Sequence, residues 1–147
     1  MRRVEKVIFR IIDANLNRSR EGLRVCEEVS RFILNSDTLT KELKRARHAI
    51  SAIIARLPPA SRRLFDHRDA EGDVGRASKT RDEMRRAGYR DIFEANMERV
   101  KESLRVLEEF FKLVDVKRSA AFKNLRFKIY DIEKRALKRI ASLRDTG

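Results

Sequence analysis

One stretch of this chain occurs twice. Residues 13–32 read DANLNRSREGLRVCEEVSRF and residues 94–113 read EANMERVKESLRVLEEFFKL, so the two segments align without a gap at a constant offset of 94 − 13 = 81 residues. The identical positions are Ala14/Ala95, Asn15/Asn96, Arg18/Arg99, Glu21/Glu102, Leu23/Leu104, Arg24/Arg105, Val25/Val106, Glu27/Glu108 and Glu28/Glu109. Most of these are polar, which helix-forming bias alone does not reproduce. The chain must therefore pack two related units, and the retained polar residues suggest a site built from both.

The composition predicts an all-α protein. The chain has 147 residues, of which 40% are charged and 41% hydrophobic, with only five Gly and two Pro. This composition suits long helices, and the length suits a single helical domain over residues 1–147. One cysteine, Cys26, excludes an internal disulfide framework and favours a reducing compartment, so we expect a cytoplasmic protein. Because no run of about 18 apolar residues occurs, we expect neither export nor membrane insertion.

Apolar residues recur with helical spacing in four segments. The spacing predicts helices over residues 4–34, from the Ser36 or Asp37 cap to Leu57, over 91–114 and over 118–143. Pro58-Pro59 ends the second helix, and residues 58–90 form a polar connection with a short helix closed by Gly88. Residues 10–57 and 91–143 would each form an antiparallel helical hairpin. The two hairpins predict a four-helix bundle with approximate two-fold symmetry.

Several polar residues fall on the faces that the pattern predicts to be apolar. On a helical wheel Asn15 and Arg18 lie on the apolar face of the first helix, and Asn96 and Arg99 occupy the equivalent positions in the second copy. Arg126 lies on the inward stripe of the last helix. These side chains should point inward or into a cleft. The predicted apolar face of the first helix comprises Ile11, Ile12, Gly22, Leu23, Val25, Cys26, Val29, Phe32 and Ile33.

Three inward arginines require anions. Glu21 and Glu102, at the border of the same faces, would neutralise two of them in a purely structural network. A bound phosphate is the other interpretation, because guanidinium groups bind phosphate oxygens bidentately and keep their charge when partly desolvated. The remaining repeated carboxylates, Glu27, Glu28, Glu108 and Glu109, are predicted to project outward and to pair with neighbouring basic side chains.

The segment RDAEGDVG, from Arg68 to Gly75, is a second candidate site. Asp69 and Asp73 would hold Mg²⁺ through their carboxylates, while Gly72 and Gly75 would let backbone N–H groups approach a phosphate. The segment lacks the distal Glu of an EF-hand and the G-K-[ST] element of a P-loop. An exposed polar linker is the alternative.

The net charge of +13 suggests an alternative function. Such a charge attracts polyanions, so a basic helical-bundle module that binds nucleic acid or another partner without catalysis is the alternative to an enzyme. However, the basic residues are spread along all helices and interleaved with Glu, and no recognised nucleic-acid-binding motif occurs. An enzyme acting on phosphorylated small molecules would carry a similar charge.

The blocks RIIDANLNRSREGLRVCEEVSRF, RDAEGDVG, DIFEANMERVKESLRVLEEFFK and KIYDIEKR occur in this order. Together they resemble the small all-helical hydroxymethylpyrimidine-phosphate kinase family of thiamine biosynthesis, whose members occur alone or fused ahead of thiamine-phosphate synthase. The resemblance spans residues 10–139. It implies ATP-dependent phosphorylation of 4-amino-5-hydroxymethyl-2-methylpyrimidine phosphate to the pyrophosphate, with ATP and Mg²⁺ as cofactors and a functional link to the synthase. The oligomeric state stays open, with a homo-oligomer among the options.

Within this resemblance we assign roles to residues by physical argument, since phosphoryl transfer depends on positioning and charge stabilisation. Arg18, Arg99 and Arg126 are expected to act on phosphate groups; Asn15, Asn96, Glu21 and Glu102 to bind the substrate; Arg68, Gly72 and Gly75 to form a phosphate loop; and Asp69 and Asp73 to hold the metal.

Overall fold

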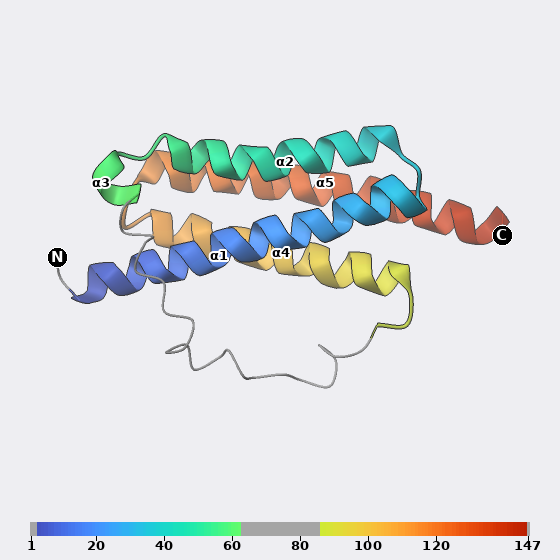
Figure 1. Cartoon of the computed structure of the whole chain (residues 1–147), viewed down its shortest axis with the longest axis horizontal. Helices are drawn as coiled ribbons and strands as arrows, with labels where there is room; N and C mark the ends of the chain where they lie inside the picture. Colours follow the sequence, from blue (N-terminus) through green and yellow to red (C-terminus); the bar gives the residue numbers. More distant parts are fainter. Residues whose placement is uncertain (1–2, 63–85, 147) are drawn as a thin grey trace.

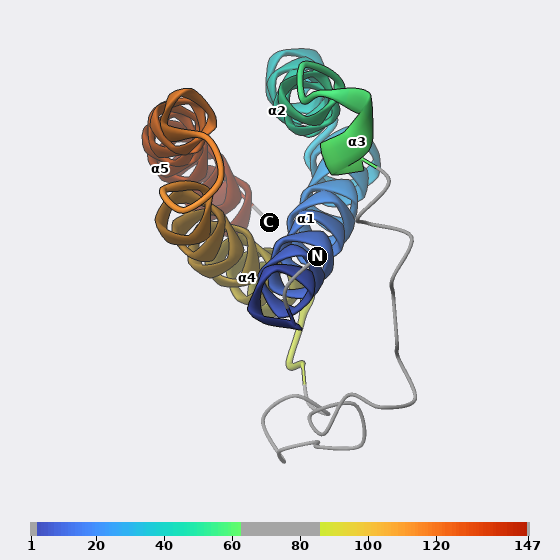
Figure 2. The same cartoon turned by 90° about the vertical axis from the view of Figure 1, so that its left-hand side faces the viewer.

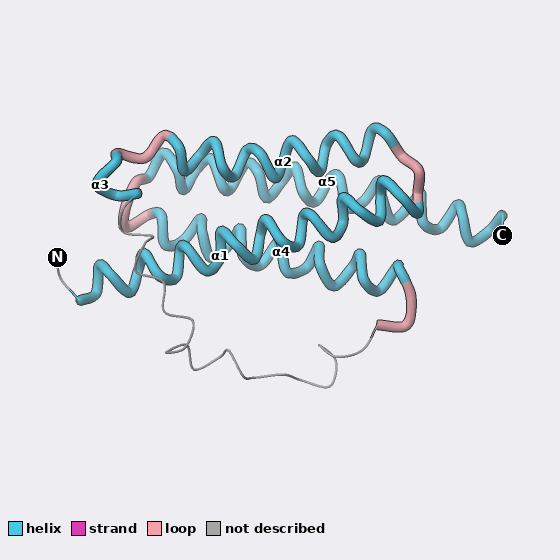
Figure 3. The backbone as a smooth tube through the Cα atoms, in the orientation of Figure 1, coloured by secondary structure: helices cyan, strands magenta, loops and turns pink. Residues whose placement is uncertain are grey.

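The computed structural model describes residues 3–62 and 86–146, and these residues form helices and no strands (Figures 1 and 3). The four long helices are α1 (Arg3–Glu28), α2 (Asp37–Ala55), α4 (Tyr89–Phe111) and α5 (Val116–Thr146). Two short elements are the π-helix η1 (Val29–Ile33), which continues α1, and α3 (Pro59–Arg62). The all-α prediction is thus confirmed. Within the described ranges, no helix is both long and apolar enough to span a membrane.

The four long helices form two layers, with α1 and α4 in one and α2 and α5 in the other (Figure 1). The most extensive contact joins α1 to α4, followed by α4 with α5 and α1 with α2, and the contact of α2 with α5 is smaller than these three. Viewed along the bundle, α1 and α4 lie close together and α2 and α5 diverge (Figure 2). The boundaries of the predicted repeats, 10–57 and 91–143, and of the single domain stay predictions from the sequence.

The core consists of the apolar stripes that the helical spacing predicts. In α5, Phe122, Leu125, Ile129, Ile132, Ala136 and Ile140 are buried, and in α2, Leu39, Leu43, Ala46 and Ile50 are buried. Phe122 stacks on Phe111 of α4 with 5.2 Å between ring centroids. Burial of these stripes is what holds the amphipathic helices together.

The end of the first helix differs from the prediction. The backbone N–H of Leu34 donates to the carbonyl of Val29, five residues earlier, so the last turn is a π-helix rather than an α-helix. The wider turn changes the register, and Phe32 and Ile33, expected in the core, are 68% and 46% exposed. The predicted stop is correct, since Asn35 has a positive φ of 49°, a conformation that asparagine tolerates.

The N-cap of the next helix also agrees with the prediction. The Ser36 side chain accepts a hydrogen bond of 3.2 Å from the backbone N–H of Leu39, which satisfies a donor at the start of α2. Asn35 and Ser36 together therefore fix the turn between α1 and α2.

Small residues bring α1 and α4 together. The hydroxyls of Ser19 and Ser103 hydrogen-bond across the contact at 2.7 Å, and both are buried. A Cβ atom added to Gly22 would lie 2.7 Å from Cγ2 of Val100 and 3.0 Å from the carbonyl oxygen of Asn96. The helices therefore meet so closely that glycine is the residue that fits position 22 without a shift of the second helix.

Candidate functional site

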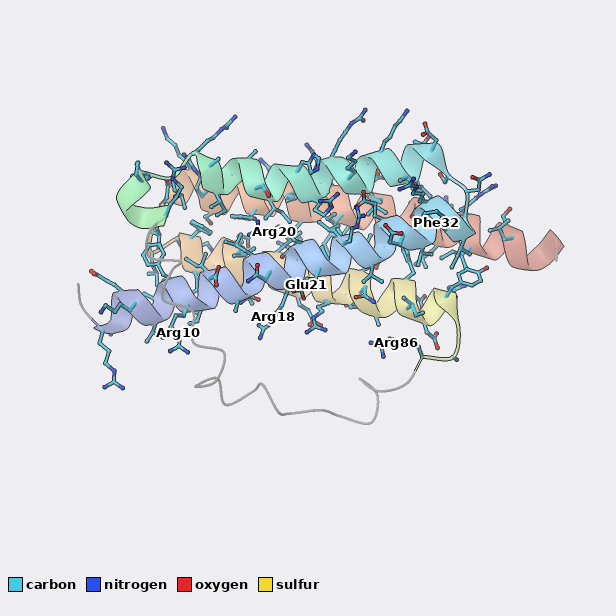
Figure 4. The ribbon with its side chains drawn as sticks, viewed as in Figure 1. Arg10, Arg18, Arg20, Glu21, Phe32 and Arg86 are labelled. Atoms are coloured by element: carbon cyan, nitrogen blue, oxygen red, sulfur yellow. The ribbon has the colours of Figure 1, made fainter. Side chains whose placement is uncertain are left out.

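Arg18 and Arg99 lie on the exposed surface, so of the two predicted orientations, inward or into a cleft, the inward one is wrong. Figure 4 shows Arg18 directed away from the layer of α2 and α5. The helical wheel assigned too wide a range of residues to the apolar face. The stripe that contacts α4 runs through Ser19 and Gly22, and Arg18 stands at its outer border, where a long cation reaches water.

These two arginines nevertheless lie on the same side of the molecule. Arg18 is one turn from Gly22, which contacts α4, and Arg99 is one turn from Ser103, which contacts α1. Because the inner side of this layer is filled by the core, both exposed side chains flank the helix contact on its outer side. We call this surface the α1–α4 face and define it by Arg18, Glu21, Arg99 and Glu102, which are exposed, together with Asn15 and Asn96 at the helix contact.

The two asparagines of this face make the same hydrogen bond. Nδ2 of Asn15 donates to the carbonyl of Ile11, and Nδ2 of Asn96 donates to the carbonyl of Ile92, each at 2.8 Å. Asn15 is only 5% exposed, as the inward prediction requires, and Asn96 is half-buried. Each amide keeps a second N–H and its carbonyl oxygen for another partner.

The charged residues of the α1–α4 face are not neutralised by one another. Within the described part of the chain, neither Arg18 nor Arg99 forms an ion pair, and Glu21 and Glu102 also form none. The structural network proposed from the sequence, in which these glutamates neutralise the arginines, is therefore not present. The four charges of the face sum to zero, but its two guanidinium groups pair with no described residue and can meet a ligand.

Glu27 and Glu108 are two further charged residues whose orientation the sequence analysis predicted incorrectly. Both were expected to project outward, yet they are 4% and 3% exposed. Each is bound by an arginine of another helix: Arg47 of α2 reaches Glu27 at 3.0 Å, and Arg126 of α5 reaches Glu108 at 3.3 Å. The predicted pairing with basic neighbours does occur, with Arg24 three residues before Glu27. These ion pairs join the helices within each sequential pair.

Arg126 points inward as predicted, and its anion is a protein carboxylate. The side chain is 13% exposed, contacts Glu108, and lies 5.1 Å from the ring centroid of Phe127 and 5.9 Å from that of Tyr130. Burial alone would lower the pKa of Arg126, but Glu108 and Tyr130 raise it overall, so the guanidinium stays charged. Its Nε has no hydrogen-bond partner in the described structure, so one donor is left over.

The predicted loop site lies outside the described residues. This applies to Arg68, Gly72 and Gly75, assigned to phosphate, and to Asp69 and Asp73, assigned to Mg²⁺. Among the described residues no group of three or more His, Cys, Asp or Glu side chains is placed to hold a metal ion.

Cys26 is fully buried and its Sγ donates to the carbonyl of Phe93 at 3.6 Å. Burial, with a smaller contribution from Glu133, raises the pKa of the thiol above its ordinary value, so it stays neutral and unreactive. We predict that a thiol-reactive disulfide reagent labels the native protein slowly and labels it fully once urea unfolds it. Because the chain has one cysteine, the absorbance change of the reagent reports the labelling of Cys26 alone. Rapid labelling without denaturant would show that this part of the core opens.

By its fold and this face, the chain is a helical-bundle protein that presents duplicated Asn and Arg residues on one helix pair. The sequence profile of the ThiD2 family matches residues 10–135, and the chain belongs to that family. This confirms the family resemblance drawn from the repeated blocks. No solved structure matches the chain.

Three curated relatives are thiamine-phosphate synthases. That of Nostoc sp. is 39% identical over 132 residues, which are 90% of this chain and 36% of that protein. The Synechocystis sp. protein is 43% identical over 126 residues, 86% of this chain and 35% of its own length. The Rhodopirellula baltica protein is 38% identical over 125 residues, 85% of this chain and 33% of its own length. The chain thus spans about a third of the length of these relatives.

Proposed function

We propose that this chain acts in thiamine biosynthesis and transfers a phosphoryl group from ATP to hydroxymethylpyrimidine phosphate, which gives the pyrophosphate. The observation that carries the proposal is membership of the ThiD2 family over residues 10–135, together with relatives named thiamine-phosphate synthase. In this reaction an oxygen of the substrate phosphate attacks the γ-phosphorus of ATP, and the bond from that phosphorus to ADP breaks.

The α1–α4 face supports this reaction through its two exposed arginines and its duplication. Both reactants carry phosphate groups, and the face presents two guanidinium groups, Arg18 and Arg99, on either side of one helix contact, neither paired with a carboxylate of the described residues. Arginine binds phosphate oxygens bidentately and can stabilise negative charge that develops during transfer. The amides of Asn15 and Asn96 lie one turn away and each has a free donor and acceptor for the pyrimidine or its phosphate.

Magnesium would supply positive charge that offsets the charge of the phosphates when bound. Asp69 and Asp73 remain the proposed ligands, and their carboxylates suit a cation that prefers oxygen donors. Arg126 remains proposed as a phosphate contact through the guanidinium nitrogens that Glu108 does not occupy, since its Nε, unpaired in the described structure, is buried.

The proposal predicts that Arg18→Ala and Arg99→Ala each lower kcat/KM for ATP-dependent phosphorylation by about tenfold or more, because a charge-assisted contact to phosphate is lost. Thermal unfolding should be unchanged, since both side chains are exposed and unpaired in the described structure. The measurement is a coupled assay of ADP formation with the pyrimidine monophosphate.

Arg31→Ala is a matched control, since Arg31 is an exposed arginine whose guanidinium lies over the Phe32 ring, outside the α1–α4 face. Full activity in both test variants would remove these arginines from the site. No ADP formation by the wild-type chain with Mg²⁺ and both reactants would contradict the kinase activity itself.

The nucleic-acid alternative rests on the charge of +13. Many cations of the described helices are paired with carboxylates of the same helix, as in Lys41 with Asp37 and Arg90 with Glu94, which weakens the attraction to a polyanion. Melting the protein with Mg²⁺ plus the pyrimidine monophosphate, ATP or a short RNA separates the two functions, because a ligand that binds the native state raises its stability. A shift with RNA alone would favour the alternative.

A further inference from the structure

The side of the bundle opposite the α1–α4 face contains a groove between α2 and α5. Its volume is about 690 Å³, within the range of roughly 300–1,000 Å³ that is common for small-molecule sites. Ala46 and Ala49 of α2 and Leu125 and Ile132 of α5 contribute its apolar part. The helices α2 and α5 diverge on this side of the bundle (Figure 2). The side chains of the two alanines are too small to fill the space between them.

Polar bridges between the two helices limit the groove along the bundle. At one end Nη1 of Arg135 on α5 donates to the carboxylate of Glu42 on α2 at 2.6 Å. Beyond the other end Nη2 of Arg118 on α5 donates to the carbonyl of Arg56, just after α2, at 2.9 Å. A helix from another protein would have to break these bridges to lie along the groove, whereas a small molecule fits between them.

The charges at the rim favour an anion. Arg135 contacts both acidic residues of the lining, Glu42 and, at 2.9 Å, Asp131, so one positive charge is shared by two carboxylates. Arg45 and Lys128 are exposed, line the groove and form no ion pair with any described residue. The three basic and two acidic residues of the lining give the groove a net charge of +1, and Arg45 and Lys128 supply two cations, unpaired among the described residues, beside an apolar floor. Phe127, which is 53% exposed, adds an aromatic ring at the edge.

We propose that the α2–α5 groove is a second ligand site that binds a small aromatic anion. The ring of the ligand packs on the alanines, Ile132 and Phe127, and its acidic group meets Arg45 and Lys128. The site is separate from the α1–α4 face, and it does not depend on the proposed kinase activity.

Fluorescence titration of the folded chain with the dye anilinonaphthalene sulfonate tests the site, because this probe is itself a small aromatic anion. We expect saturable binding by the wild type. The double variant Arg45→Glu/Lys128→Glu should bind the dye roughly tenfold more weakly, because two charges beside the bound sulfonate are reversed. Ala49→Met, which fills part of the groove, should also weaken binding.

Lys6→Glu/Lys117→Glu is the control, since it changes the net charge equally at exposed lysines away from the groove and should bind the dye like the wild type. Circular dichroism melts of all variants establish that they are folded before titration. The absence of saturable binding by the folded wild type would overturn the proposal. So would equal affinities of the groove double variant and the control.

Discussion

Glu108→Ala is expected to lower the free energy of unfolding by about 3 kcal/mol, the cost of removing one partner from a buried ion pair. The Glu108 side chain is 4% exposed and its carboxylate contacts Arg105 and Arg126. Arg126 is itself only 13% exposed, so the substitution leaves a largely buried guanidinium group without its anion. Urea unfolding at neutral pH, followed by circular dichroism, should show a lower midpoint with an unchanged slope.

The neighbouring residue Glu109 is the matched control. Its side chain is 43% exposed and pairs with Arg105 and Lys112 on the same helix, where water screens the charges. The urea midpoint of Glu109→Ala should therefore equal that of the wild type within experimental error. Equal losses in the two variants would show that the Glu108 ion pair is not a special feature of the core.

A double variant separates a structural role of Arg126 from a catalytic one. Glu108→Leu/Arg126→Met replaces both charges by apolar groups of similar length, which restores much of the stability that a single substitution loses. If this folded variant keeps its full phosphorylation activity, Arg126 acts only as the partner of Glu108. Loss of activity in the folded variant would support the role assigned to Arg126.

Gly22→Val is expected to destabilise the protein by about 3 kcal/mol, at the upper end of the range for overpacking a close contact. Any Cβ at position 22 would lie 2.7 Å from Cγ2 of Val100, a β-branched side chain with little freedom to move, and 3.0 Å from the backbone oxygen of Asn96. The helices α1 and α4 would have to separate, and the Ser19–Ser103 hydrogen bond would lengthen. The urea midpoint measures the loss.

Gly88→Val provides the comparison, because a Cβ at Gly88 would meet nothing within 4 Å and its backbone is extended, with φ of −177°. This variant should stay within about 0.5 kcal/mol of the wild type. In the double variant Gly22→Ala/Val100→Ala, the loss should be smaller than the sum of the two single losses, because the second substitution removes the atom with which the new methyl group collides. Strict additivity would contradict the close contact.

The helices and most of the core were predictable from the sequence, because burial of one stripe imposes a helical period on the apolar residues. The π-helical turn at Val29–Ile33 was not, since one extra residue in a turn leaves no mark in composition, and Phe32 and Ile33 were misplaced as a result. The stop at Asn35 and the cap at Ser36 were correct because local backbone chemistry alone determines them.

The site residues stay a prediction from the sequence, and the structure tests only their orientation. The duplication identified Asn15, Arg18 and their counterparts, but a wheel cannot tell the border of a helix contact from its centre, and Arg18 proved to be exposed. Glu108 is buried because an arginine of another helix reaches it, and that contact depends on tertiary packing, which the spacing along one helix does not contain.

The contact between α1 and α4 also bears on how the chain folds. Ser19 contacts Ser103, which lies 84 residues later in the sequence. The main partner of α1, the helix α4, is therefore synthesised well after α1. Until α4 leaves the ribosome, the stripe around Gly22 has nothing to pack against, and helix pairs with such distant contacts fold more slowly than bundles of neighbouring helices. Ribosomes that pause before α4 should therefore carry a nascent chain that proteases cut readily.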